Sequence, residues 1–229
     1  MSPTIFFDTG PIITLVTSRL WWILPKLKQQ IKGTFYITPA VKRELVDRPL
    51  ETKRFEFEAL QAWKLLRDGV LEVYSAVPQP KVNELRNMAN ESFLVKNKSI
   101  DIMQEGEMEV VASAVAAKAS AVIIDERTLR LSIENPQAVR HLLEHRFQNE
   151  VTCKPDLIKG FSKALQGVPI LRSTELVALA YRLGWLDEYI PPLKGGRSVL
   201  LESVLWATKV NGAAVSEEEI EELKAVLLK

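Results

Sequence analysis

The chain has 229 residues, 47% of them hydrophobic, so it can bury a sizeable core and disorder is excluded for most of it. Its 30 basic and 29 acidic residues give a formal charge of +1, which excludes a global field that attracts nucleic acid, membranes or acidic partners. The single cysteine, Cys153, excludes an internal disulfide framework and a cysteine-rich zinc site.

One apolar stretch near the start, residues 11–25, resembles a membrane or export segment in composition. It is interrupted by Arg19 and is too short to span a bilayer. A signal peptide carries positive charge ahead of its apolar segment, whereas here Asp8 stands ahead of it. We therefore expect a cytoplasmic protein that does not bind membranes.

Short strand-like runs alternate with longer helical patterns along the chain. This alternation is typical of a parallel sheet with helices above and below it, and the nearly continuous apolar runs at either end indicate strands covered on both faces. We predict a three-layer α/β/α domain with a parallel sheet of four to five strands. The expected strands are Thr4 to Phe7, Thr34 to Thr38, Leu71 to Ser75, Ala121 to Ile124 and Val168 to Leu171.

The helical patterns lie between these strands. Residues 39–48 form one, with Pro39 near its start, and an Ala-rich helix follows Gly106. Residues 51–67 form another, whose predicted apolar face is Phe55, Leu60, Trp63 and Leu66.

Two further segments extend this plan. Residues 131–167 have mostly helical periodicity and are predicted to form a helical insertion within a domain spanning residues 1–190. Residues 191–229 are predicted to form a helical C-terminal extension, with a capping box from Ser216 to Glu219 at its last helix. The apolar stripe of that helix, Ile220, Leu223 and Leu227, would pack on its own domain or join two subunits.

Several acids stand where they can meet. Asp8 and Asp125 each end a predicted strand, and the carboxyl ends of parallel strands are where such sheets bind ligands. Glu44 lies beside the apolar stripe of its helix. Glu107 shares a stripe with buried-type residues, whereas Glu109 is expected to face water, although it remains a further candidate ligand.

Four carboxylates at one edge of a sheet repel one another and acquire raised pKa values unless a cation is present. Oxygen-only ligation favours Mg²⁺ or Mn²⁺. Such a cation activates water in phosphodiester hydrolysis. The acids therefore point to a metal-dependent hydrolase.

The ordered set of motifs resembles the PIN-domain nucleases, and in particular their prokaryotic branch with a Gly-Glu-x-Glu helix. The resemblance covers roughly residues 3–130 and 168–187. The motifs are Phe7-Asp8-Thr9-Gly10-Pro11, Ile37 to Leu45, Gly106-Glu107-Met108-Glu109 and Ile123-Ile124-Asp125-Glu126-Arg127.

The resemblance implies that Asp8, Glu44, Glu107 and Asp125 bind the metal and catalyse endonucleolytic cleavage of RNA. Ser173-Thr174 stands where that branch more often has Gly-Thr, so a supporting or substrate-binding role is expected there. Relatives also form dimers, and some are toxins held by antitoxin proteins, so both kinds of partner are expected. Arg127 and Arg130 follow Asp125 closely enough to border a phosphate site.

Other interpretations stay open. Asp8 and Asp125 would each serve as helix caps, and Glu44 would serve as a solvated helix charge. The fold would also suit a catalytically weak RNA-binding or assembly module. A third interpretation is a zinc peptidase, because His141, Glu144 and His145 fit the His-x-x-Glu-His pattern.

Overall fold

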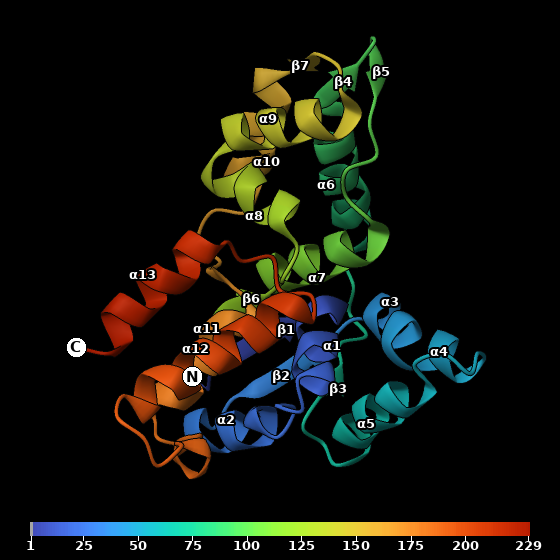
Figure 1. Cartoon of the computed structure of the whole chain (residues 1–229). Helices are drawn as coiled ribbons and strands as arrows, with labels where there is room; N and C mark the ends of the chain where they lie inside the picture. The colour runs from blue at the N-terminus through green and yellow to red at the C-terminus, as the bar shows by residue number, and fades with distance from the viewer. Residues whose placement is uncertain (1) are drawn as a thin grey trace.

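The computed structural model describes residues 2–229, except for the side chains of residues 133, 134 and 136. A parallel sheet of five strands, in the order β3-β2-β1-β6-β8, forms its centre (Figure 1), as the strand-like runs predict. Strand β1 pairs with β2 on one side and with β6 on the other. The strands are β1 (Thr4–Phe7), β2 (Thr34–Ile37), β3 (Glu72–Val73), β6 (Ala121–Ile123) and β8 (Ile170–Leu171).

Apolar side chains on both faces of the central strands hold the sheet between two helical layers. Phe6 and Phe7 point to opposite faces and are fully buried. Phe6 contacts Tyr36 and Tyr74, whereas Phe7 contacts Phe35. The architecture is therefore the expected three-layer α/β/α arrangement.

One helical layer is visible in front of the sheet in Figure 1, where α1, α11 and α12 lie side by side. Helix α7 packs directly on β1 and β6. No helix among the described residues is long and apolar enough to cross a membrane. The helices of the main body are α1 (Thr9–Thr17), α2 (Ile23–Ile31), α3 (Pro39–Lys42), the π-helical segment η1 (Arg43–Asp47), α4 (Arg48–Leu50), α5 (Glu56–Arg67), α7 (Glu105–Ala116), α11 (Ser173–Arg182) and the 3₁₀ turn η2 (Asp187–Tyr189).

The predicted insertion is mostly helical, as expected, but it also contains a short strand. Residues 151–153 form a strand that pairs antiparallel with residues 93–95, and this second, three-stranded sheet has the order β5-β4-β7. This sheet and the helices around it form a lobe that projects from the main sheet in Figure 1. A separate apolar cluster of Phe93, Val139, Leu143 and Val151 fills the lobe. Its elements are α6 (Gln79–Glu91), β4 (Phe93–Val95), β5 (Lys98–Ser99), α8 (Arg127–Glu134), α9 (Pro136–Phe147), β7 (Val151–Cys153) and α10 (Pro155–Ala164).

The predicted apolar face of α5 is mostly wrong, since only Leu66 of its four residues packs against the core. Phe55, Leu60 and Trp63 are exposed by 53%, 45% and 44%, while the helix buries Ala59, Ala62 and Leu65. Two of these three buried side chains are alanines, so the helix lies close to its neighbours and its large side chains turn outward. An apolar surface is thereby left open on α5.

The C-terminal extension packs on its own domain, one of the two arrangements expected. Its two helices are α12 (Gly196–Val210) and α13 (Glu217–Leu227). Ile220 is fully buried, and Leu223 and Leu227 pack against the main core. The predicted capping box is present, since Ser216 and Glu219 each accept from the other's backbone N–H.

Candidate functional site

Two of the predicted acids end neighbouring strands. The Asp8 N–H donates to the carbonyl of Ile123 (3.0 Å), so the ladder between β1 and β6 continues up to Asp8. Asp125 follows β6 by two residues. Because the two strands are adjacent and parallel, both acids emerge at the same edge of the sheet.

Glu44 lies in the π-helical segment η1, a widened turn of a kind that often marks functional sites. Its Oε2 accepts a hydrogen bond from the Thr9 hydroxyl (3.0 Å), which ties it to the start of α1. Gly106 lets the carboxylate approach α7, because a Cβ at that position would lie 3.3 Å from Glu44 Oε1. Glu44 is therefore held between α1 and α7.

Glu107 stands in the first turn of α7. Its Oε2 accepts the Gln104 N–H (2.9 Å) and so completes a capping box. The negative charge also suits the positive end of the helix dipole. Helix capping thus fixes Glu107 at the rim of the sheet without occupying both of its oxygens.

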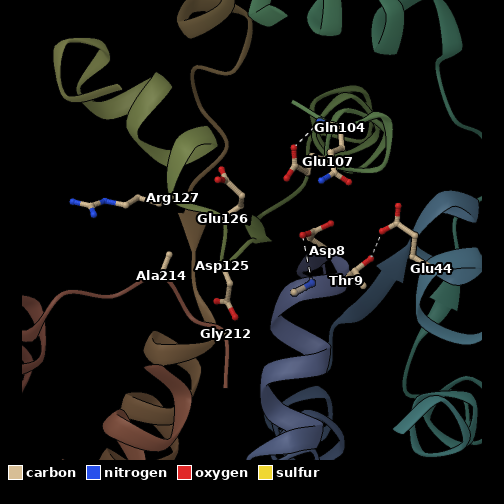
Figure 2. A pocket seen from close by; sticks show the side chains of 11 residues that line it. Asp8, Thr9, Glu44, Gln104, Glu107, Asp125, Glu126, Arg127, Gly212 and Ala214 are labelled. Atoms are coloured by element: carbon tan, nitrogen blue, oxygen red, sulfur yellow. Dashed lines mark hydrogen bonds between the residues drawn. The ribbon is translucent and has the colours of Figure 1, made fainter. Parts of the chain in front are cut away.

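All four predicted acids line one cavity of about 430 Å³. Figure 2 shows the carboxylates of Asp8, Glu44 and Glu107 around this hollow, with Glu126 as a fifth acid on the opposite wall. The lining is Asp8, Thr9, Gly10, Glu44, Gln104, Glu107, Asp125, Glu126, Arg127, Gly212 and Ala214.

Burial and mutual repulsion disfavour the charged forms of these acids. Burial raises the pKa of Asp8 to about 6, and the charges of Glu44 and Asp125 add to the effect. Burial likewise raises the pKa of Glu107 to about 8, with Asp8, Glu126 and Glu44 contributing. These acids therefore keep their protons to a higher pH than free side chains do, and a bound cation would favour their charged forms.

Asp125 is the most tightly held of the four. Its Oδ1 accepts the Ser173 N–H, and its Oδ2 accepts the hydroxyls of Thr14 and Ser173, all at 2.8 Å. Burial raises its pKa, while these hydrogen bonds act in the opposite direction. Its carboxylate is turned away from that of Asp8 in Figure 2.

The chemistry of the donor set fits a hard divalent cation, because it consists of carboxylate oxygens with uncompensated charge. Their spacing does not form a finished coordination shell. Among the residues whose side chains are described, no three His, Cys, Asp or Glu side chains stand close enough to hold one metal ion together.

The alternative interpretation of Asp8 and Asp125 as helix caps holds in part. Asp8 is the N-cap of α1 and accepts the Gly10 N–H at 3.5 Å. Helix α8 is capped by Glu126, which accepts the Leu129 N–H at 2.7 Å, so Asp125 does not cap the helix that follows it. Capping of the helix that follows accounts for Glu126 and partly for Asp8, but not for Glu44, and Asp125 instead accepts the N–H of Ser173 at the start of α11.

The expectation that Glu109 faces water is wrong. Glu109 is only 5% exposed, and its Oε2 accepts the Ala40 N–H (3.0 Å) at the start of α3. Because this acid satisfies a buried helix terminus, it does not line the cavity. Glu109 joins α7 to α3, which leads directly into the segment η1 that carries Glu44.

Arg127 and Arg130, the two basic residues predicted to border a phosphate site, have different surroundings. Arg127 lines the cavity at its rim, with its guanidinium extending away from the acids in Figure 2. Arg130 instead forms an ion pair with Glu219 of α13 (3.0 Å). Ser173 and Thr174 are fully buried, and Ser173 supports Asp125 rather than lining the cavity.

Several residues that contribute to the candidate site were not predicted from the sequence. Thr14 is a polar residue in the apolar run from Ile12 to Val16, which was a usable signal that its hydroxyl has a buried partner. Gly212 and Ala214 bring the C-terminal extension to the cavity wall, and the Ala214 N–H donates to the Asp125 carbonyl (3.2 Å). No signal in their own residue types indicated this position.

The His-x-x-Glu-His pattern lies on α9, away from the acidic cavity. Glu144 is engaged by Arg140 (2.8 Å) and by the Val151 N–H (3.4 Å). The His141 side chain is 77% exposed. Within the described part of the chain, no three side chains here lie close enough to hold one metal ion, so the zinc interpretation gains no support.

Comparison with known families gave one result. A family model described as a PIN domain matches residues 4–135, more than half of the chain. Searches against curated proteins and solved structures returned no match. The matched segment contains all four predicted acids.

Proposed function

Since the chain belongs to the PIN-domain family, we propose that it is an endoribonuclease that depends on Mg²⁺ or Mn²⁺. Members of this family generally have a nuclease-type fold and use divalent metals. The observation that carries the proposal is that Asp8, Glu44, Glu107 and Asp125, from four separate segments, line one cavity.

These four acids would hold the cation. When bound, it supplies a Lewis acid that activates water and neutralises charge on the phosphodiester. The raised pKa values of Asp8 and Glu107 support this role, because a cation would stabilise the charged forms that burial and, to a smaller extent, the neighbouring acids disfavour.

The surrounding residues orient the acids. Hydrogen bonds from Ser173 and Thr14 favour the charged form of Asp125 and fix its orientation, and Thr9 restrains Glu44. Arg127 at the rim is placed to attract the phosphate backbone of an approaching strand. Each hydrogen bond thus restricts a carboxylate that has to meet the cation.

Cleavage of single-stranded RNA with Mn²⁺ tests the proposal. Asp8→Asn and Asp125→Asn remove charge with little change of shape, and Glu150→Gln is a matched control at an acid that is 87% exposed. Removing an outer-shell partner of a metal ligand lowers activity by roughly 10- to 100-fold, and we expect the cleavage rate of both site variants to fall by more than this. Equal rates in all four proteins would contradict the proposal.

A second candidate is a catalytically weak module that binds or assembles with RNA. The spacing of the acids favours it, because within the described side chains no three lie close enough for one cation. Calorimetry separates the two functions. RNA binding without any heat of Mn²⁺ binding would favour the module, whereas stoichiometric Mn²⁺ binding lost in Asp8→Asn would favour the nuclease.

A further inference from the structure

An apolar pocket of about 250 Å³ adjoins the acidic cavity on the other side of Glu44. Its walls come from α1, from the segment that carries Glu44 and from the start of α5. Two carboxylates, Glu44 and Glu58, interrupt an otherwise apolar lining. The main apolar residues are Ile13, Leu45, Pro49 and Phe55.

Glu44 is a shared wall of three hollows. It lines the acidic cavity, the apolar pocket and a smaller hollow of about 190 Å³ that contains Arg43 and Arg48. Both arginines are exposed. The predicted metal ligand Glu44 therefore lies between the apolar pocket and two cationic side chains.

Phe55 presents an aromatic ring at the pocket. The side chain is 53% exposed, and the Arg54 guanidinium lies 4.8 Å from the ring centroid. Its backbone has a φ of +62°, which bulky residues rarely adopt. An exposed ring with a cation beside it is the arrangement with which proteins stack the bases of single strands.

We propose that this pocket binds one unpaired base of a single-stranded RNA, adjacent to the phosphate in the acidic cavity. The position of that phosphate rests on the proposed function. The base stacks on Phe55, and a neighbouring phosphate meets Arg43 and Arg48. A duplex hides its base faces by stacking, so the pocket selects single strands.

The acids in the pocket add a preference among bases. Glu58 is partly buried at the lining, and a carboxylate accepts hydrogen bonds from the amino group of a base, as Glu and Asp do from cytosine N4. Uracil has no amino group. We therefore expect amino-bearing bases to bind better than uracil, and Glu58→Gln to reduce the difference.

Fluorescence anisotropy with a labelled single-stranded RNA tests the pocket, in the presence of a chelator so that the proposed metal-dependent cleavage does not consume the probe. Phe55→Ala removes the ring, and Phe57→Ala is the matched control, because Phe57 is 71% exposed, is close in sequence and does not line the pocket. We expect Phe55→Ala to weaken binding by about 5-fold or more and Phe57→Ala to leave it unchanged. Phe55→Tyr keeps the ring and should bind like the wild type.

An oligonucleotide series with one abasic nucleotide at each position locates the base. At one position the abasic change should weaken wild-type binding but add nothing in Phe55→Ala. Equal RNA binding by Phe55→Ala and Phe57→Ala would contradict the base-pocket proposal. So would additive effects of the abasic change and Phe55→Ala on the binding free energy at every position. If the wild type fails to cleave RNA but Phe55→Ala still weakens binding, the nuclease proposal fails while the base pocket stands.

Discussion

Ser173 binds Asp125 through two hydrogen bonds of 2.8 Å, one from its backbone N–H to Oδ1 and one from its hydroxyl to Oδ2. The bonds join the first residue of α11 to an acid that follows β6. One short segment thereby satisfies a helix terminus and fixes a predicted metal ligand.

Ser173→Ala removes the hydroxyl and leaves the backbone bond in place. Because the hydroxyl stabilises the charged form of Asp125, its loss raises the pKa of that acid, and the pH at which activity appears should move upward. We expect Mn²⁺ affinity to fall by about 10-fold. Thr174→Val is the control, since the Thr174 hydroxyl bonds to Glu175 instead. Identical pH profiles in the two variants would show that Ser173 does not tune Asp125.

Gly106→Ala separates stability from function. Alanine in a helix is favoured over glycine by about 0.5–1 kcal/mol, so the folded state should hold or gain stability. The new Cβ would lie 3.3 Å from Glu44 Oε1, and the carboxylate must give way by a few tenths of an ångström. Calorimetry should show weaker Mn²⁺ binding together with an unchanged or higher melting temperature. Unchanged Mn²⁺ affinity would remove Glu44 from the metal site.

Glu107 should make the metal-free protein lose stability as pH rises. The folded-state pKa of about 8 exceeds the ordinary value of 4.5, so the folded protein binds more protons than the unfolded chain between these values. Stability is therefore greatest near or below the ordinary pKa and falls as pH approaches about 8.

Urea unfolding with a chelator checks this direction. Glu107→Gln should be more stable than the wild type at the alkaline end, by about 1 kcal/mol once solvent screening is allowed for, and similar to it at the acidic end. Added Mn²⁺ should stabilise the wild type and not the variant. A wild type that gains stability on alkalinisation without metal would contradict the raised pKa.

Arg172 should matter for stability. Its side chain is 9% exposed and pairs with Glu175 (2.6 Å) and with Glu219 (2.8 Å) of the C-terminal extension. Arg172→Ala leaves both acids without this partner, and we expect a loss of about 3 kcal/mol of unfolding free energy. The control is Arg197→Ala, whose exposed pair with Asp187 should contribute less than about 1 kcal/mol. Equal denaturation midpoints for Arg172→Ala and Arg197→Ala would show that Arg172 does not stabilise the packing of the C-terminal extension.

The main sheet was predictable from the sequence because most of its strands are apolar runs that end in polar residues, although β3 is short and exposed. The second sheet was not, since β4 and β7 are three residues each and pair residues as distant as Phe93 and Cys153. The buried face of α5 was missed for a related reason. Periodicity favoured the large side chains, whereas close packing selected Ala59 and Ala62.

The acids of the candidate site were predictable because adjacent parallel strands bring their ends together. The positions of Glu107 and Glu109 on α7 were harder, since both lie near a helix start where acids are generally favoured. The wall formed by Gly212 and Ala214 depends on how the extension docks, and neither residue type indicates a site. Long-range packing decided these parts.

Anomalous diffraction from a crystal soaked in Mn²⁺ tests the cation site most directly. We expect one peak in the acidic cavity, within coordination distance of oxygens from Asp8, Glu44, Glu107 and Asp125, with the Ser173 hydroxyl still bound to Asp125. A cavity that shows no peak at saturating Mn²⁺, with the four carboxylates as far apart as in the metal-free protein, would contradict the assignment.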